Sequence, residues 1–157
     1  MDKDVKFEKI LVPSDGSKFA RNALFHAITM AKKFGSKIHI ISVVDPEYIP
    51  PGMLLGLLKE NRRLEESVVK FLTSVKTQVR KDLLAEVAIC KSKGIDVSYD
   101  ILLGKPVEMI LKYAKGKKID LIIMGSQGLH GVSKLKVLGS VSRKVSELSP
   151  CAVMLIH

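Results

Sequence analysis

Five short apolar segments, rich in β-branched residues, alternate with amphipathic helical patterns along the chain. The segments are residues 9–12, 37–44, 97–103, 119–124 and 151–156. Most of them are apolar on both faces, which is typical of parallel strands covered by helices on either side. In the third segment Ser98 and Asp100 partly restore an alternating pattern, so we expect this strand to lie near an edge of the sheet.

Helical patterns fill the intervals between the apolar segments. From Ser17 to Phe34 the apolar residues fall on one stripe, with Ser17 as the expected N-cap and Gly35 as the expected left-handed stop. Pro106 suits the first turn of a third helix, and Pro150 ends a fourth. A second, long helix is predicted by the apolar positions Leu64, Val68, Phe71, Val75, Val79, Leu83 and Val87.

The order of these elements predicts a single α/β domain that spans residues 1–157. Strands that alternate with helices through right-handed crossovers give a doubly wound parallel sheet with helices on both faces. We expect a five-stranded sheet in the order 3-2-1-4-5. Residues 45–56 contain three prolines and are expected to form an irregular loop after the second strand.

The composition narrows the possible classes of function. No apolar run approaches the ~20 residues of a membrane span, and the opening MDKDVKFEKI has no apolar stretch typical of a signal peptide, so we expect a cytoplasmic protein. Cys90 and Cys151 lie far apart without metal-binding spacing, which argues against a disulfide scaffold or a zinc site. The net charge of +10 suggests nucleic-acid binding as a lesser alternative. Because the lysines are spread over every segment, a solvated basic surface is the favoured interpretation.

The carboxyl edge of the predicted sheet is the expected ligand site. In doubly wound sheets, ligands bind beyond the strand ends where the strand order reverses. The stretches that reach this edge are Pro13-Ser14-Asp15-Gly16-Ser17, Val43-Val44-Asp45 and the loop that begins Met124-Gly125-Ser126-Gln127-Gly128. The pair Gly139-Ser140 then follows, just ahead of the fourth helix.

The glycines of this edge favour phosphate binding. Gly125 and Gly128 lack a Cβ atom, so their backbone can approach phosphate oxygens closely. Gly139 and Ser140 precede a helix, where unpaired N–H groups and the helix dipole attract anions. Each glycine pair taken alone could equally form a tight turn, but their combination at one edge favours phosphate.

Asp15 leaves two interpretations open. Its carboxylate could bind a ribose, or a Mg²⁺ ion held by nucleotide phosphates. It could equally be a turn-forming or helix-capping aspartate, which is common in a Pro-x-Asp-Gly sequence. The residue types alone do not choose between these roles.

Several of these segments resemble the universal stress protein family. They are ILVPSDGS, HIISVVD, GKPVEMILKYA, DLIIMGSQG and LGSVSRKVSELSPCAVMLI. The resemblance covers most of the chain except the region between Asp45 and Gly94. It implies a flavodoxin-like sheet, related to that of the adenine nucleotide alpha hydrolases, and the binding of ATP or AMP.

The resemblance also assigns roles to single residues. The family's nucleotide-binding pattern is Gly-x-x-Gly, nine residues, then Gly-Ser or Gly-Thr, and here residues 129–138 make the interval ten residues long. By resemblance, Asp15 holds the ribose or phosphate side, the backbone of Val43 contacts adenine, and Ser140 with Val141 holds the phosphates. The complete predicted site comprises Pro13, Asp15, Val43, Met124, Gly125, Gly128, Gly139, Ser140 and Val141.

The sequence contains no recognisable catalytic motif. Neither a GxSxG elbow nor a Walker-type GxxxxGK[ST] pattern is present. His130 lies in the glycine loop, where contact with phosphate is a lesser possibility. We therefore expect a nucleotide-responsive regulator of the stress response, with a slow ATP-hydrolysing or phosphate-transferring enzyme as the alternative.

The last predicted strand, from Cys151 to Ile156, is apolar and lies at an edge of the expected sheet. An exposed apolar edge strand promotes aggregation unless something covers it. A symmetric homodimer in which this strand meets its own copy would cover it. The resemblance to universal stress proteins also implies dimers of this kind.

Overall fold

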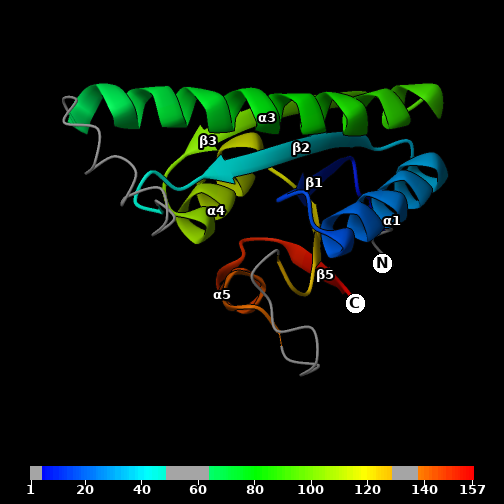
Figure 1. Ribbon diagram of the computed structural model, residues 1–157. Coiled ribbons are helices and arrows are strands. Elements are labelled where there is room, and N and C mark those ends of the chain that lie inside the picture. Colours follow the sequence, from blue (N-terminus) through cyan, green and yellow to red (C-terminus); the bar gives the residue numbers. More distant parts are fainter. Residues whose placement is uncertain (1–4, 49–63, 129–137) are drawn as a thin grey trace.

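A computed structural model describes residues 5–48, 64–128 and 138–157 of the chain. Within these residues five parallel strands form one sheet in the order β3-β2-β1-β4-β5, which confirms the predicted topology (Figure 1). The strands are β1 (Lys9–Pro13), β2 (Lys37–Val44), β3 (Val97–Leu103), β4 (Leu121–Gly125) and β5 (Ala152–Ile156).

Helices cover both faces of this sheet (Figure 1). The long helix α3 lies along β2 and β3, and it shares one face with α1, while α4 and α5 pack on the opposite face. The helices described are α1 (Lys18–Phe34), α3 (Leu64–Ser92), α4 (Pro106–Lys117) and α5 (Ser140–Leu148).

The central strand β1 shows why the apolar segments have no polar face. Ile10 and Val12 pack beneath α1 and α3, whereas Leu11 packs beneath α4 and α5, and all three side chains are completely buried. Strand β1 pairs with β2 on one side and β4 on the other, so the strand order reverses beside it. The carboxyl end of β1 therefore opens at the switch point of the sheet.

The helix ends follow the predicted signals. The Ser17 hydroxyl accepts a hydrogen bond from the Ala20 amide at 3.1 Å, and Gly35 adopts the left-handed conformation (φ 69°) that stops α1. Pro106 opens α4. The polar third strand, β3, lies at one edge as expected.

Two strands begin later than the sequence analysis predicts. Strand β4 begins at Leu121 rather than at residue 119, because the Ile119 amide donates to Ala114 O and belongs to the end of α4. Strand β5 begins at Ala152 rather than at Cys151, because the Cys151 amide donates to Ser149 Oγ.

The segment after β2 is described only in part. The side chain and carbonyl of Asp45 accept hydrogen bonds from the amides of Glu47 and Tyr48, which makes a turn. The rest of the loop predicted over residues 45–56 lies outside the described residues. Among the helices that are described, none combines the length and the apolar character needed to cross a membrane.

Candidate functional site

A cavity of about 750 Å³ opens at the carboxyl edge of the sheet, beside the point where the strand order reverses. Its volume falls within the range usual for small-molecule sites, roughly 300–1,000 Å³. The structure brings every residue of the predicted site to this cavity. Its lining includes Pro13, Asp15, Val43, Met124, Gly125, Gly128, Gly139, Ser140 and Val141.

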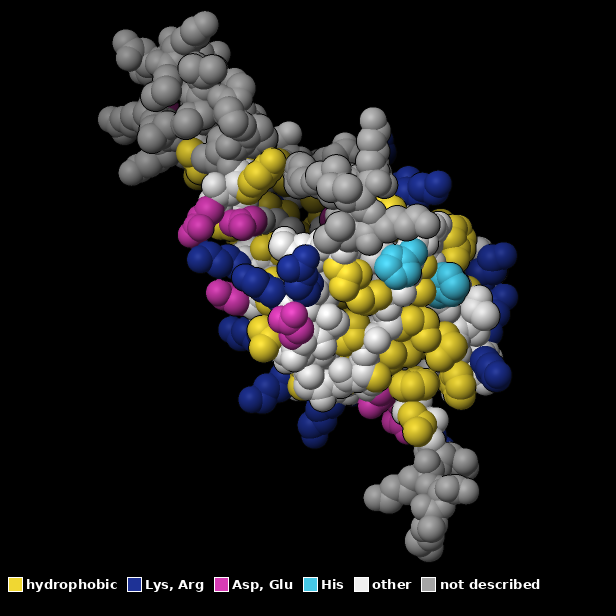
Figure 2. All heavy atoms as spheres, turned by 90° about the horizontal axis from the view of Figure 1, so that it is seen from below, with side chains coloured by type: hydrophobic (Ala, Val, Ile, Leu, Met, Phe, Trp, Pro, Cys, Tyr) yellow, Lys and Arg dark blue, Asp and Glu magenta, His cyan; other side chains and the backbone are white. Residues whose placement is uncertain are grey.

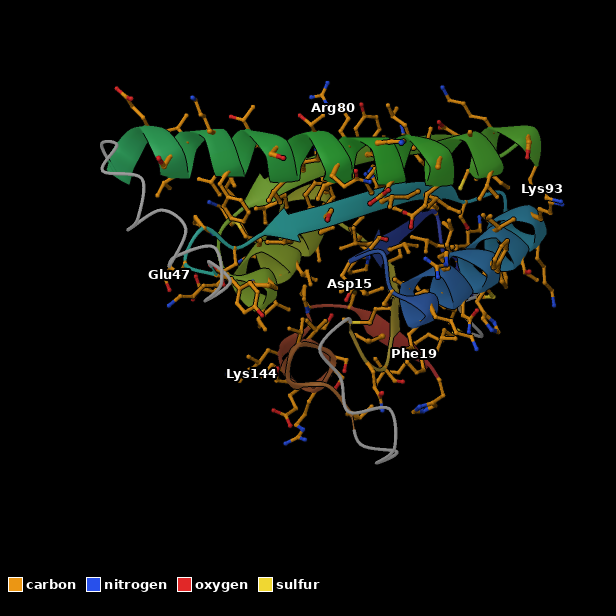
Figure 3. The ribbon with its side chains drawn as sticks, viewed as in Figure 1. Asp15, Phe19, Glu47, Arg80, Lys93 and Lys144 are labelled. Atoms are coloured by element: carbon orange, nitrogen blue, oxygen red, sulfur yellow. The ribbon has the colours of Figure 1, made fainter. Side chains whose placement is uncertain are left out.

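The turn between β1 and α1 places Asp15 at the cavity (Figure 3). Asp15 Oδ1 accepts a hydrogen bond from the Ser17 amide at 2.9 Å, and Gly16 adopts a positive φ of 78°. The turn is tied to β2 because the Ser14 amide donates to Ile41 O at 2.8 Å. One carboxylate oxygen of Asp15 thus stabilises the turn, as the structural interpretation of this residue predicts.

The second carboxylate oxygen of Asp15 faces the glycine loop. A Cβ atom built on Gly128 would lie 2.7 Å from Asp15 Oδ2, which is closer than real Cβ contacts. Gly128 therefore leaves room for this carboxylate at the mouth of the cavity. The bond from the Ser17 amide uses Oδ1, whereas Oδ2 is the carboxylate oxygen that lies toward Gly128.

Gly125 is explained by packing. A Cβ at this position would lie 2.7 Å from Phe19 Cβ and 2.8 Å from the backbone carbon of Phe19 (Figure 3 labels Phe19 on the first turn of α1). The amide nitrogen of Ala20 would lie only 3.1 Å away. Glycine thus allows the start of α1 to pack directly against the end of β4.

A hydrogen-bond cluster around Ser126 joins the two parts of the glycine motif. Ser126 O accepts from the Gly139 amide at 2.8 Å and from Ser142 Oγ at 2.7 Å. These bonds place the start of α5 directly beside the end of β4. The ten-residue interval of the motif, including His130, lies almost entirely outside the described residues, so only its two ends are located.

The N-terminus of α5 has the features of an anion site. Its N-cap, Gly139, provides no side-chain hydrogen bond, and the first turn holds no acidic residue. By contrast, the Ser17 side chain caps α1. Ser140 and Val141, the first two residues of α5, line the cavity, and the dipole of the helix favours negative charge at this end.

Helix α3 supplies an apolar wall that the sequence analysis does not assign to the site. Its cavity-lining side chains are Phe71, Leu72, Val75 and Val79. The stripe that predicts α3 contains three of these positions, but an apolar stripe alone does not distinguish core packing from the lining of a cavity. Phe71, Val75 and Val79 are half-buried, which is expected for side chains that border a cavity.

A second unpredicted feature is a buried carboxyl group behind the Asp15 turn. Glu86 of α3 is 7% exposed, and its Oε1 accepts a hydrogen bond from Ser14 Oγ at 2.7 Å. Burial raises the pKa of the Glu86 carboxyl above its ordinary value, while the bond from Ser14 acts in the opposite direction. The signal in the sequence is a charged residue between Leu83 and Val87 on an apolar stripe.

The cavity can therefore hold a ligand with an apolar part and an anionic part. The apolar wall of α3 stands on one side, and the uncapped start of α5 stands at the other. Within the residues described, no group of three or more histidine, cysteine, aspartate and glutamate side chains is arranged to hold a metal ion.

Comparisons with known proteins agree with this architecture. The sequence model of the Universal stress protein family matches residues 6–157. The universal stress protein YxiE of Bacillus subtilis is 31% identical over 155 residues, covering 96% of this chain and 99% of YxiE. The structure of MJ0577, a protein of Methanocaldococcus jannaschii, has a TM-score of 0.81 and 25% identity and covers 97% of this chain and 96% of its own. A universal stress protein in complex with cAMP has the same fold, with a TM-score of 0.68, 21% identity and coverage of 97% and 98%.

Proposed function

This chain belongs to the universal stress protein family, and on that premise we propose that its cavity binds an adenine nucleotide, ATP or AMP. We propose further that nucleotide binding makes the protein a regulator in the stress response. The observation that carries the proposal is one cavity with an apolar wall, a carboxylate and an uncapped helix N-terminus. An adenine nucleotide has matching parts in its base, its ribose and its phosphates.

The lining suggests an orientation for the nucleotide. The base lies between the backbone of Val43 and the apolar wall of α3, and the ribose lies near Asp15. The phosphates lie at Gly128 and at the first-turn amides of α5, where the dipole favours them. Asp15 Oδ2, beside Gly128, would also be the carboxylate oxygen for a Mg²⁺ ion that arrives with ATP. The protein of this fold in complex with cAMP supports the choice of an adenine nucleotide.

The first prediction is direct binding of AMP and ATP. Titration calorimetry on the purified protein should give a dissociation constant on the order of micromolar. Asp15→Ala should weaken binding about tenfold, because a ribose or Mg²⁺ ligand is lost. The matched control is Asp96→Ala, since Asp96 is an exposed aspartate just before β3, at the amino end of the strands, where it forms an ion pair with Lys37.

Two results would contradict this proposal. One is the absence of binding heat with every adenine nucleotide tested. The other is an unchanged affinity in Asp15→Ala, which would place the ligand elsewhere. Rapid ATP turnover, near the median of about 10 per second for ordinary enzymes, would instead favour the enzymatic alternative.

We also propose that the protein is a homodimer through β5. This strand pairs only with β4 among the described strands, so its outer edge has unpaired backbone groups. Its residues Val153, Met154 and Leu155 are half-buried rather than buried. Apolar side chains gather on the face of the molecule where β5 and α5 lie (Figure 2). A second copy of this strand would form hydrogen bonds with the unpaired backbone groups of β5 and cover its apolar side chains.

The dimer gives a second prediction. Light scattering should report a dimer at protein concentrations on the order of tens of micromolar, and Leu155→Lys should shift it to a monomer by placing charge at the interface. The control is Leu103→Lys, because Leu103 is an exposed leucine at the opposite edge, on β3. Circular dichroism should show both variants folded. A monomeric unmodified protein would exclude this assembly.

A further inference from the structure

A buried polar contact links helix α3 to the turn that carries Asp15. Ser14 Oγ donates to Glu86 Oε1 at 2.7 Å, and both residues are at least nine-tenths buried. We propose that Glu86 is a positioning residue that holds the Asp15 turn in the geometry required for nucleotide binding. This inference rests on the proposed function of the cavity.

The turn is held at two points by side chains from different helices. Glu86 of α3 holds Ser14, and Arg21 of α1 donates from Nη1 to Gly16 O at 2.8 Å. Asp15 lies between these two anchors, with one oxygen bound to Ser17 and the other beside Gly128. If the Ser14–Glu86 bond is removed, the Ser14 side of the turn keeps only its backbone bond to Ile41, and we expect the carboxylate of Asp15 to be held less firmly.

Packing alone does not explain a glutamate at this position. Its neighbours Leu83 and Val87 are buried in the apolar core, and Glu86 Oε2 has no hydrogen-bond partner among the described residues. An apolar side chain of similar size would avoid the cost of burying a carboxyl group. Residues that cost stability at such positions are commonly retained for function.

The surroundings of Glu86 provide little charge compensation. Asp82 lies on the same helix and Asp15 on the turn, and both disfavour a second negative charge, while Arg21 of α1 favours it. Burial outweighs these effects and raises the pKa of Glu86. Its side chain also borders a second cavity of about 260 Å³, which Arg21 and Asp82 line as well. Gly16 lines this cavity too, so Glu86 and the Asp15 turn border the same cavity.

Helix α3 therefore contributes to the nucleotide cavity twice. Phe71, Val75 and their neighbours form its apolar wall, and Glu86, several turns further along, fixes the turn on the ribose side. Because both features belong to one helix, the position of the wall and the position of Asp15 are coupled through Glu86.

Three substitutions test this role by calorimetry with AMP. Glu86→Leu should weaken binding at least tenfold, while its thermal midpoint stays equal to that of the unmodified protein or rises. Glu86→Gln keeps a carbonyl oxygen that can accept from Ser14, so its affinity should stay within about threefold. Ser14→Ala should reproduce the loss seen in Glu86→Leu, and the double variant should lose no more than either single variant. Asp82→Asn, one turn earlier on the same helix, is the matched control and should bind normally.

The proposal is overturned if Glu86→Leu binds AMP as tightly as the unmodified protein. It is also overturned if the double variant loses as much binding free energy as Ser14→Ala and Glu86→Leu lose together. Should Glu86→Leu fail to fold, Ser14→Ala and Glu86→Gln decide, because one removes the donor and the other preserves the acceptor. Amide hydrogen exchange without ligand separates this idea from the proposed function. Protection of the Ser17 amide, which donates to Asp15 Oδ1, should fall about tenfold in Ser14→Ala and in Glu86→Leu and persist in Glu86→Gln. The Gly16 amide is not used, because its own acceptor is Ser14 Oγ. Unchanged protection would refute the positioning role even if the cavity binds no nucleotide.

Discussion

Gly125→Val is expected to prevent folding, and Gly125→Ala to destabilise the protein by about 3 kcal/mol. A Cβ atom here would overlap the first turn of α1, where Phe19 contributes both side-chain and backbone atoms within 2.8 Å. Backbone atoms of a helix cannot move aside separately, so α1 would have to leave the sheet. Chemical denaturation of the alanine variant measures the loss of free energy of unfolding.

Gly116→Ala is the matched control for this prediction. Gly116 lies inside α4, and a Cβ built on it meets no atom within 4 Å. Alanine should therefore stabilise the helix by roughly 0.5–1 kcal/mol, the opposite sign to Gly125. If the Gly125→Ala and Gly116→Ala variants unfold at the same denaturant concentration, the packing explanation of Gly125 is wrong.

Gly128→Val is expected to weaken adenine nucleotide binding by about 100-fold or more while the fold is retained. Its Cβ would lie 2.7 Å from Asp15 Oδ2, so valine displaces the carboxylate and occupies the proposed phosphate side of the cavity. The atom displaced belongs to a side chain and not to a helix backbone. The expected effect is therefore mainly on ligand binding, and the effect on stability is limited to the bond between Asp15 and the Ser17 amide.

Calorimetry and thermal unfolding on the same samples check the prediction for Gly128→Val. The thermal midpoint of Gly128→Val should stay close to that of the unmodified protein, in contrast to Gly125→Ala. A substitution of Gly139 should disturb the structure less than one of Gly128, because a Cβ on Gly139 would make only ordinary contacts. The nearest of these contacts is 3.4 Å, to Ser126 O. An unchanged affinity of Gly128→Val for adenine nucleotides would show that Gly128 does not belong to the binding site.

The comparison of Gly125 with Gly128 shows how far the sequence predicts the site. The sequence correctly predicts that both glycines lie at the carboxyl edge of the sheet, because they follow the fourth predicted strand. It does not distinguish them, since one depends on the approach of α1 and the other on the side chain of Asp15. Each of those distances is a tertiary property that no local pattern encodes.

The same reasoning applies to the rest of the fold. The apolar segments predict the strands because burial on both faces leaves a strong local signal. The strand order follows instead from the doubly wound topology expected for alternating strands and helices. The starts of β4 and β5 are mispredicted because hydrogen bonds of Ile119 and Cys151 to preceding residues decide them. The contact between Ser14 and Glu86 joins residues 72 positions apart, so the sequence shows only an unusual charge on an apolar stripe.

The bond from the Gly139 amide to Ser126 O has a consequence for how this motif tolerates insertion. This bond joins the end of β4 to the start of α5. The spacing between Ser126 and Gly139 is therefore set by the bond and not by the number of residues that connect them. Lengthening such a closed segment by one residue costs only about 0.1 kcal/mol of closure entropy. The extra residue between Gly128 and Gly139 is therefore compatible with an unaltered arrangement of Ser126, Gly139 and Ser142. The number of residues between Gly128 and Gly139 can therefore change without a change in the bonds from Gly139 and Ser142 to Ser126.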